Sequence, residues 1–172
     1  MTVIKSKYFI LRPFRKGDAR AITENINNKK IYRNTLHIPY PYTLKDANEW
    51  LAKTLKEAKK KKPSKVNFAI DINGEVIGSV SLEKIEGHKS EIGYWLAEKF
   101  WGRGITTEAV KMVTKFGFNR LRLKRIYAKV FPFNKTSMQI LRRNGYKFEG
   151  IIRKNTKKDN KFFDDYLFAK VK

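Results

Sequence analysis

The chain has 172 residues, 41% of them hydrophobic, which is enough for one folded domain with its own core and short for two. It has no cysteine and only two histidines, so disulfides, a thiolate nucleophile and cysteine-ligated metals are excluded, and no spacing typical of metal ligands appears. The formal net charge of +23 should attract polyanions such as RNA or an anionic cofactor, although a lysine-rich proteome would give the same excess.

The amino-terminal residues, MTVIKSKYF, lack the apolar stretch of a secretory signal, and no apolar run of about 18 residues occurs in the chain. We therefore expect a cytoplasmic protein that does not enter a membrane. No repeat, linker or low-complexity tract interrupts the sequence, so we expect a single domain over residues 1–172.

The first part of the chain combines one strand pattern with two helix patterns. Tyr8–Phe14 is typical of a strand, and Asp18 can cap a helix that ends near residue 27. The aromatic segment Lys30–Tyr42 has no regular period and is typical of a loop beside a site. Thr43 then caps a second helix, with Asp46 three residues later as a variant of the capping box.

The second part contains six strand patterns and two helix patterns. The strands are Val66–Ile72, Glu75–Glu86, Glu91–Ala97, Arg125–Phe131, Tyr146–Lys154 and Phe162–Val171, the last two around a polar turn, Asn155–Asn160. The helices are Ile105–Phe118 and Asn134–Arg143. This order predicts an α+β fold with a mixed, mostly antiparallel sheet of six or seven strands flanked by about four helices.

A loop with two glycines, Trp101-Gly102-Arg103-Gly104, joins the Glu91–Ala97 strand to the Ile105–Phe118 helix. Glycine lets the backbone approach a ligand closely. The amides in the first turn of the helix have no intrahelical partner and carry the positive end of the helix dipole. The combination favours binding of a phosphate or pyrophosphate. Glycines at such junctions also occur as simple turn residues, and the physical argument alone leaves both explanations open.

The string YWLAEKFWGRGITTEAV resembles the coenzyme-binding region of the GNAT N-acetyltransferase superfamily. The general signature of that superfamily is Gln/Arg-x-x-Gly-x-Gly/Ala. The aligned residues of this chain are WGRGIT, residues 101–106. Only Gly104 matches the signature strictly, and Trp101 and Thr106 depart from it. The string is closer to the RimJ/RimL branch, where Trp-Gly-x-Gly-x-x-Thr-Glu-Ala is usual. Leu-Arg-Pro at residues 11–13 and Asn134-x-x-Ser137 followed by NGYKFEG extend this resemblance over nearly the whole chain.

The resemblance implies a three-layer GNAT fold, splayed between the fourth and fifth predicted strands, and acetyl-coenzyme A as co-substrate with no metal. The pyrophosphate of the coenzyme should bind to the glycine loop and the first helical turn. These are formed by Trp101, Gly102, Arg103, Gly104, Ile105, Thr106 and Thr107. The pantetheine arm should bond the backbone of Trp95, Leu96 and Ala97 at the exposed edge of the fourth strand. Asn134 and Ser137 are implied to contact the coenzyme from the other side.

The reaction implied by the family is direct attack of an amine on the thioester in a ternary complex, which agrees with the absence of a cysteine to carry the acetyl group. Glu91 begins the strand where many relatives place a catalytic glutamate, so it is the candidate base, acting through water; a salt bridge with a lysine is its structural alternative. Many GNAT enzymes use a tyrosine as the general acid, and this chain has Leu141 at that position. The RimJ/RimL branch instead has a serine three residues after the asparagine, so the resemblance implies Ser137 as the candidate acid. Its alternative role is to cap the helix or to bond a backbone carbonyl.

Tyr32, His37 and Tyr40 are candidates for the acceptor side, where they could stack on a peptide or pack beneath their own loop. The first hypothesis is acetylation of a protein amino terminus, with a ribosomal protein as the typical acceptor of the branch and weak RNA attraction through the basic surface. The second is acetylation of a small amine such as an antibiotic or polyamine, although the sequence is poor in the acidic residues that a cationic acceptor favours. The third is a basic RNA-associated protein that keeps the fold. A monomer and a homodimer both stay open.

Overall fold

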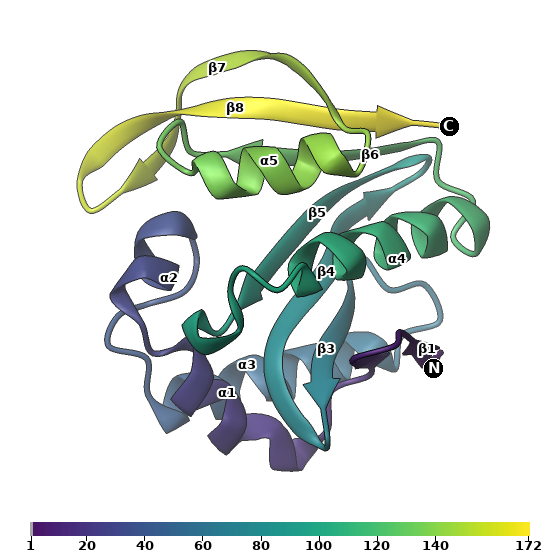
Figure 1. Cartoon of the computed structure of the whole chain (residues 1–172), viewed down its shortest axis with the longest axis vertical. Helices are drawn as coiled ribbons and strands as arrows, with labels where there is room; N and C mark the ends of the chain where they lie inside the picture. Colours follow the sequence, from purple (N-terminus) through teal and green to yellow (C-terminus); the bar gives the residue numbers. More distant parts are fainter. Residues whose placement is uncertain (1) are drawn as a thin grey trace.

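The computed structural model describes residues 2–172, which form one eight-stranded sheet with helices on both faces (Figure 1). The strand order is β1-β2-β3-β4-β5-β6-β8-β7, and each neighbouring pair is antiparallel except β5 with β6. The strands are β1 (Ile4–Lys5), β2 (Ile10–Arg12), β3 (Val66–Ile72), β4 (Glu75–Glu86), β5 (Lys89–Leu96), β6 (Arg125–Val130), β7 (Lys147–Lys158) and β8 (Lys161–Val171).

The helices are α1 (Ala19–Ile26), α2 (Lys29–Asn34), α3 (Leu44–Ala58), α4 (Ile105–Asn119) and α5 (Lys135–Arg143), with short 3-10 helices at Lys16–Asp18 and Glu98–Phe100. None of the helices described over residues 2–172 has the length and apolar character needed to span a bilayer. The predicted capping box at α3 is confirmed, because Thr43 and Asp46 each accept a hydrogen bond from the backbone amide of the other.

The predicted fold class, a mixed and mostly antiparallel α+β sheet, is confirmed, with more elements than expected. The additional strand, β1, has only two residues and is too short to show an alternating pattern. The additional helix, α2, lies in the segment predicted as an irregular loop. It is held by its cap rather than by an apolar period, since the Asn28 side chain accepts hydrogen bonds from the amides of Lys30 and Ile31.

The hairpin at the carboxyl end is longer than predicted. β7 runs to Lys158, so the turn is only Asp159-Asn160 and not the whole polar segment Asn155–Asn160. Asp159 and Asn160 have φ values of 49° and 59°, in the left-handed region that Asp and Asn adopt more readily than most residues. The polar residues before them belong to an edge strand with interrupted pairing, where most polar side chains are exposed to water and Thr156 is buried.

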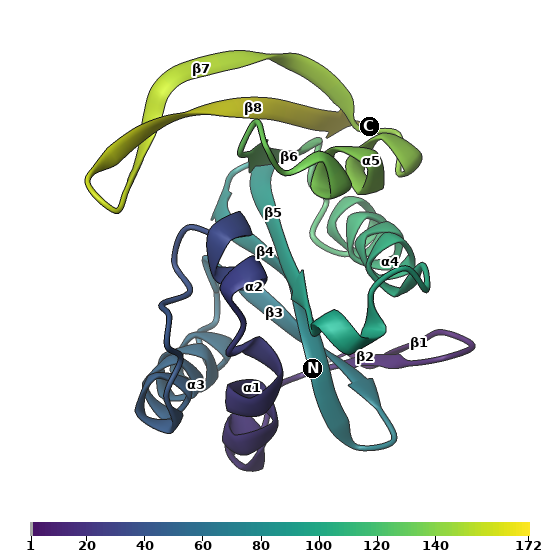
Figure 2. The ribbon, with the colours of Figure 1, turned by 60° about the vertical axis from the view of Figure 1, so that its left-hand side comes forward.

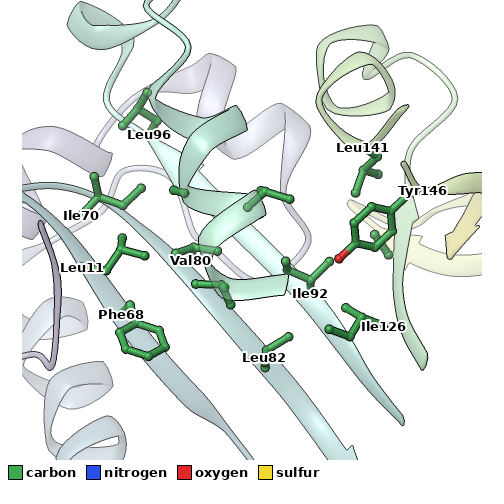
Figure 3. Close-up of a cluster of buried hydrophobic side chains, with 14 of the residues drawn as sticks. Leu11, Phe68, Ile70, Val80, Leu82, Ile92, Leu96, Ile126, Leu141 and Tyr146 are labelled. Carbon is green, nitrogen blue, oxygen red and sulfur yellow. The ribbon is translucent and has the colours of Figure 1, made fainter. Parts of the chain in front are cut away.

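The two faces of the sheet carry separate hydrophobic clusters, because successive side chains along a strand point to opposite sides. Figure 2 shows α1 and α3 on one side of β3–β5 and α4 on the other. The cluster on the α4 side appears in Figure 3 and includes Leu11, Phe68, Val80, Leu82, Ile92, Ile126 and Phe168. The cluster on the α1 and α3 side includes Phe14, Ile22, Leu51, Ala69 and Val76.

β5 and β6 separate after a short parallel pairing, which confirms the predicted splay. Residues Lys89–Glu91 pair with Arg125–Tyr127, and the register ends there. β5 continues to Leu96 and β6 continues to Val130. The sheet therefore opens between them, and the edge of β5 beyond Glu91 has no strand beside it on that side.

A buried ion-pair network connects the first strands to the start of α1. Arg12 is 1% exposed, and its guanidinium donates to both carboxylate oxygens of Asp18 at 2.8 and 2.9 Å and to Asp71 at 2.6 Å. The Asp18 and Asp71 hydrogen bonds raise the pKa of Arg12 despite its burial. The prediction that Asp18 caps α1 is wrong, since its carboxylate is used by Arg12 and by the Arg15 amide.

Replacing one carboxylate of this network should lower stability strongly. We expect Asp71→Asn to reduce the free energy of unfolding by about 3 kcal/mol, because a buried guanidinium would lose a charged partner. Urea denaturation measures this change. Glu24→Gln breaks the exposed pair with Arg20 and should leave the free energy of unfolding unchanged within error. Equal effects of the two substitutions would contradict the buried network.

Candidate active site

The opening between β5 and β6 leads into a cleft of about 750 Å³ that is lined from both faces of the sheet. On the α4 side, its walls are the glycine loop and one face of α5. On the other side, they are α2, the segment after it, part of α3 and the polar face of β4 and β5. Within residues 2–172, no three His, Asp or Glu side chains come together in a way that could hold a metal ion.

The glycine loop has the backbone expected of an anion site. Gly102 and Gly104 have φ values of 75° and 74°, in the region that favours glycine. α4 begins directly after Gly104, and no side chain caps it. The first backbone hydrogen bond into the helix is from Glu108 to Gly104, so the amides of residues 105–107 have no intrahelical acceptor. Residues 101–107 all line the cleft.

The edge of β5 offers fewer free backbone groups than predicted. The Ala97 amide donates to Ile77 at 2.8 Å, and the Leu96 carbonyl accepts from the Trp101 indole at 2.7 Å. Because backbone groups point alternately to the two sides of a strand, those of Trp95 also face β4, where it pairs with Ser79. The groups directed to the open edge belong to Tyr94 and to the Leu96 amide. This placement corrects the predicted backbone contacts of Trp95 and Ala97.

α5 presents Asn134 and Ser137 to the cleft, as predicted. Asn134 caps the helix, because its side-chain oxygen accepts from the Ser137 amide at 3.1 Å, and its side-chain amide reaches the Asn34 carbonyl at 3.5 Å. The Ser137 hydroxyl does not form a cap. It lies 2.7 Å from the Tyr94 hydroxyl, and either group can donate.

Tyr94 is the site residue that the sequence pattern missed. It belongs to the predicted Glu91–Ala97 strand, and its side chain lies between β5 and α5 and bonds Ser137. Burial raises the pKa of Tyr94, so its hydroxyl stays protonated at neutral pH. Leu141, which stands where many GNAT enzymes have a tyrosine, is fully buried in the core (Figure 3). Alternation along β5 gives the side on which Tyr94 lies, but only the fold shows that Ser137 meets it.

Glu91 lines the cleft from the face opposite to Tyr94. Its carboxylate accepts a hydrogen bond from Lys84 at 2.7 Å, and the Lys129 ammonium lies 3.8 Å away. The hydrogen bond from Lys84 to Glu91 raises the pKa of Lys84. The salt bridge expected as the structural alternative is thus present, and a catalytic role for Glu91 stays a prediction.

The three aromatic candidates for the acceptor side have different positions. His37 lines the cleft. Tyr32 and Tyr40 are outside the lining residues and lie with their rings 6.1 Å apart, so their role on the acceptor side stays a prediction. The Tyr32 hydroxyl donates to Asp159 at 2.5 Å, and the Lys158 ammonium lies 3.8 Å from the Tyr32 ring centre. These contacts hold the tip of the β7–β8 hairpin against α2, so that the hairpin and α2 together line the acceptor side of the cleft.

The sequence of the chain matches a known protein family. The family model described as "Acetyltransferase (GNAT) domain" matches residues 9–147, most of the chain. The chain belongs to the GNAT acetyltransferase family. The match ends at the first residue of β7, so the β7–β8 hairpin lies beyond it.

The chain is similar in sequence to other N-acetyltransferases and similar in fold to solved acetyltransferase structures. The N-acetyltransferase p20 of Bacillus licheniformis is 38% identical over 100 residues, covering 57% of this chain and 56% of p20, so the chain spans little more than half of that relative. The L-amino acid N-acetyltransferase AaaT of Escherichia coli is 23% identical over 95% of this chain and 98% of AaaT. The solved structure of RimL, a ribosomal L7/L12 alpha-N-protein acetyltransferase in complex with coenzyme A, has a TM-score of 0.89 at 22% identity, covering 99% of this chain and 98% of RimL.

The left-handed backbone of the glycine loop should be measurable in the stability of the chain. We expect Gly104→Ala to lower the free energy of unfolding by about 1 kcal/mol, because φ is 74° although nothing lies within 4 Å of the added methyl group. Gly17→Ala is the matched control, since Gly17 has the same free space without a positive φ, and it should be neutral or slightly stabilising. Equal urea midpoints for the two variants would contradict this explanation.

Proposed function

We propose that the chain is an acetyl-coenzyme A-dependent N-acetyltransferase that acts on the α-amino group at a protein amino terminus by direct transfer in a ternary complex. The observation that carries this proposal is the single cleft in which the uncapped start of α4, the open edge of β5 and the Ser137–Tyr94 pair meet. A pyrophosphate, a pantetheine arm and a thioester sulfur need these three features in that order.

The first part of the proposal concerns binding of the coenzyme. The amides of residues 105–107 would donate to the pyrophosphate, where the dipole of α4 favours negative charge. Arg103 and Arg143 line the same cleft and can add charge-assisted contacts to phosphate. The Tyr94 backbone would bond the pantetheine amides as an added strand does. Asn134 keeps the start of α5 in place beside them.

The second part concerns the reaction. The amine nitrogen forms a bond to the thioester carbon, and the carbon–sulfur bond then breaks. The Leu96 amide would donate to the oxyanion, and Ser137 would give a proton to the departing sulfur, with Tyr94 fixing the hydroxyl of Ser137. Glu91 would receive the proton of the ammonium group through water, since it lines the cleft on the other face of the sheet.

Chemistry shared by two relatives supports the proposed acceptor class. RimL is named for acetylation of a protein at its alpha nitrogen, and AaaT for acetylation of L-amino acids. Protein amino termini and free amino acids both present an α-amino group. We place the protein terminus first, because the acceptor side of the cleft is long and partly apolar, with Ile31, Leu36 and Trp50 in its lining. The net charge of +23 would also suit a ribosome-associated acceptor.

Coenzyme binding and acceptor class can be tested together. Saturating acetyl-coenzyme A should raise the melting temperature, because it binds the folded state alone. The protein should then acetylate peptides that have a free amino terminus and vary in their first residues. Peptides with a blocked terminus are the control, and free amino acids, polyamines and aminoglycosides are the competing acceptors. Absence of any thermal shift would contradict the enzyme assignment, whereas a preference for free amino acids would replace the acceptor.

The role of Ser137 can be measured through release of the thiol. Because the chain has no cysteine, every thiol detected in the assay belongs to coenzyme A. We expect Ser137→Ala to lower kcat about 100-fold with little change in the Kd for coenzyme A, as for loss of a general acid. Tyr94→Phe should lower kcat less, since Ser137 remains. Ser64→Ala, at an exposed serine bonded to Glu57, is the control, and a Ser137→Ala variant with normal turnover would reject the assignment.

A further inference from the structure

Asp165 differs from the other buried carboxylates in having no basic partner. Three carboxylates are buried within residues 2–172: Asp18, Asp71 and Asp165. The first two share the guanidinium of Arg12. Asp165 is 3% exposed, and no Lys, Arg or His of the described chain lies within salt-bridge distance of it. A chain with 39 basic residues thus leaves this buried charge without a counter-charge, although burial of a charge is unfavourable.

The hydrogen bonds of Asp165 use only one of its two oxygens. Oδ2 accepts from the Asn155 side chain at 2.6 Å and from the Thr156 hydroxyl at 2.7 Å. No described side chain donates to Oδ1, and no buried side-chain oxygen of residues 2–172 lacks a partner, so Oδ1 must be reachable by solvent. Asp165 and Thr156 both line the cleft, and we infer that the solvent-accessible Oδ1 is the oxygen that faces it.

The strand pattern puts Asp165 on the acceptor side of the cleft. Tyr166 and Phe168 pack in the cluster on the α4 side, so Asp165 and Leu167 point to the opposite face. Leu167 pairs with Lys129 of β6, on the same face as Glu91. Figure 2 shows the tip of the β7–β8 hairpin on the side of α2 and α3, away from α4, and Asp159 at this tip bonds Tyr32 of α2. Asp165 also lies beyond the residues that match the GNAT model, so the family match gives it no role.

We propose that Asp165 binds the ammonium group of the acceptor through Oδ1. The inference rests on the proposed function and adds a substrate class to it. An ammonium group supplies the missing counter-charge and a charge-assisted hydrogen bond, while Asn155 and Thr156 hold the carboxylate in position through Oδ2. Acceptors are therefore primary alkyl amines, including α-amino groups, which are largely protonated at neutral pH. Arylamines and hydroxyl acceptors do not carry that charge and are excluded.

The test compares two neighbouring aspartates that point to opposite faces of β8. Asp165→Asn removes the charge in the cleft, and Asp164→Asn removes the same charge from a carboxylate that accepts from the Lys154 amide outside it. With the peptide Ala-Gly-Gly-Phe amide as acceptor, Asp165→Asn should raise the acceptor KM about 10- to 100-fold, as for loss of a hydrogen bond to a charged group. The Kd for coenzyme A should not change, and Asp164→Asn should behave as the unmodified chain.

Several outcomes would overturn the inference. An unchanged acceptor KM in Asp165→Asn would do so while leaving the proposed function intact. If the unmodified chain transfers no acetyl group, the proposed function fails. Calorimetry of peptide binding to the unmodified and Asp165→Asn proteins then still decides whether Asp165 binds an ammonium group. If Asp165→Asn does not fold, the unmodified chain with coenzyme A should bind the peptide at least about tenfold more tightly than propionyl-Gly-Gly-Phe amide, which lacks the amino group. Equal binding would reject the site.

Discussion

The structure depends on the separation of β5 from β6 after Glu91. Up to that residue the two strands complete each other's hydrogen bonds, and beyond it the β5 edge must be satisfied in another way, since unpaired backbone groups are costly when buried. The Trp101 indole donates a hydrogen bond to the Leu96 carbonyl. The remaining backbone groups of this edge face a cleft that is open to solvent. The chain thus keeps part of a strand edge available for a ligand, instead of covering it with another strand.

The cleft joins two faces of one sheet that are otherwise separated by close packing. Tyr94 points toward α5, where Ser137 meets it, whereas Glu91 points toward the face covered by α1 and α3. A donor and an acceptor that enter from opposite faces can meet only where the sheet is open. The arrangement explains why α4, α5 and the β7–β8 hairpin, which are distant in the sequence from α2, all contribute to one cavity.

Local patterns in the sequence were sufficient for most of the fold, and long-range contacts account for what they missed. The Thr43–Asp46 box, the glycine loop and the hairpin after β3 depend on residues close in the chain, and each was predicted correctly. α2 was missed because six residues are too few to show a helical period. The Tyr94–Ser137 bond joins residues 43 positions apart, and only the completed sheet brings them together.

The charge of the chain has different meanings at its surface and in its cleft. Its excess of lysine and arginine raises the potential around the whole molecule and should draw it to polyanions, with a strong dependence on salt. Charges inside the cleft act over a short range and are less screened, and because Glu91 is already paired with Lys84, the proposed selection of a cation depends on the buried Asp165. The proposed acceptor, an amino terminus presented on a polyanionic particle, would meet both conditions, because the particle would be attracted at long range and the ammonium group would be selected at short range.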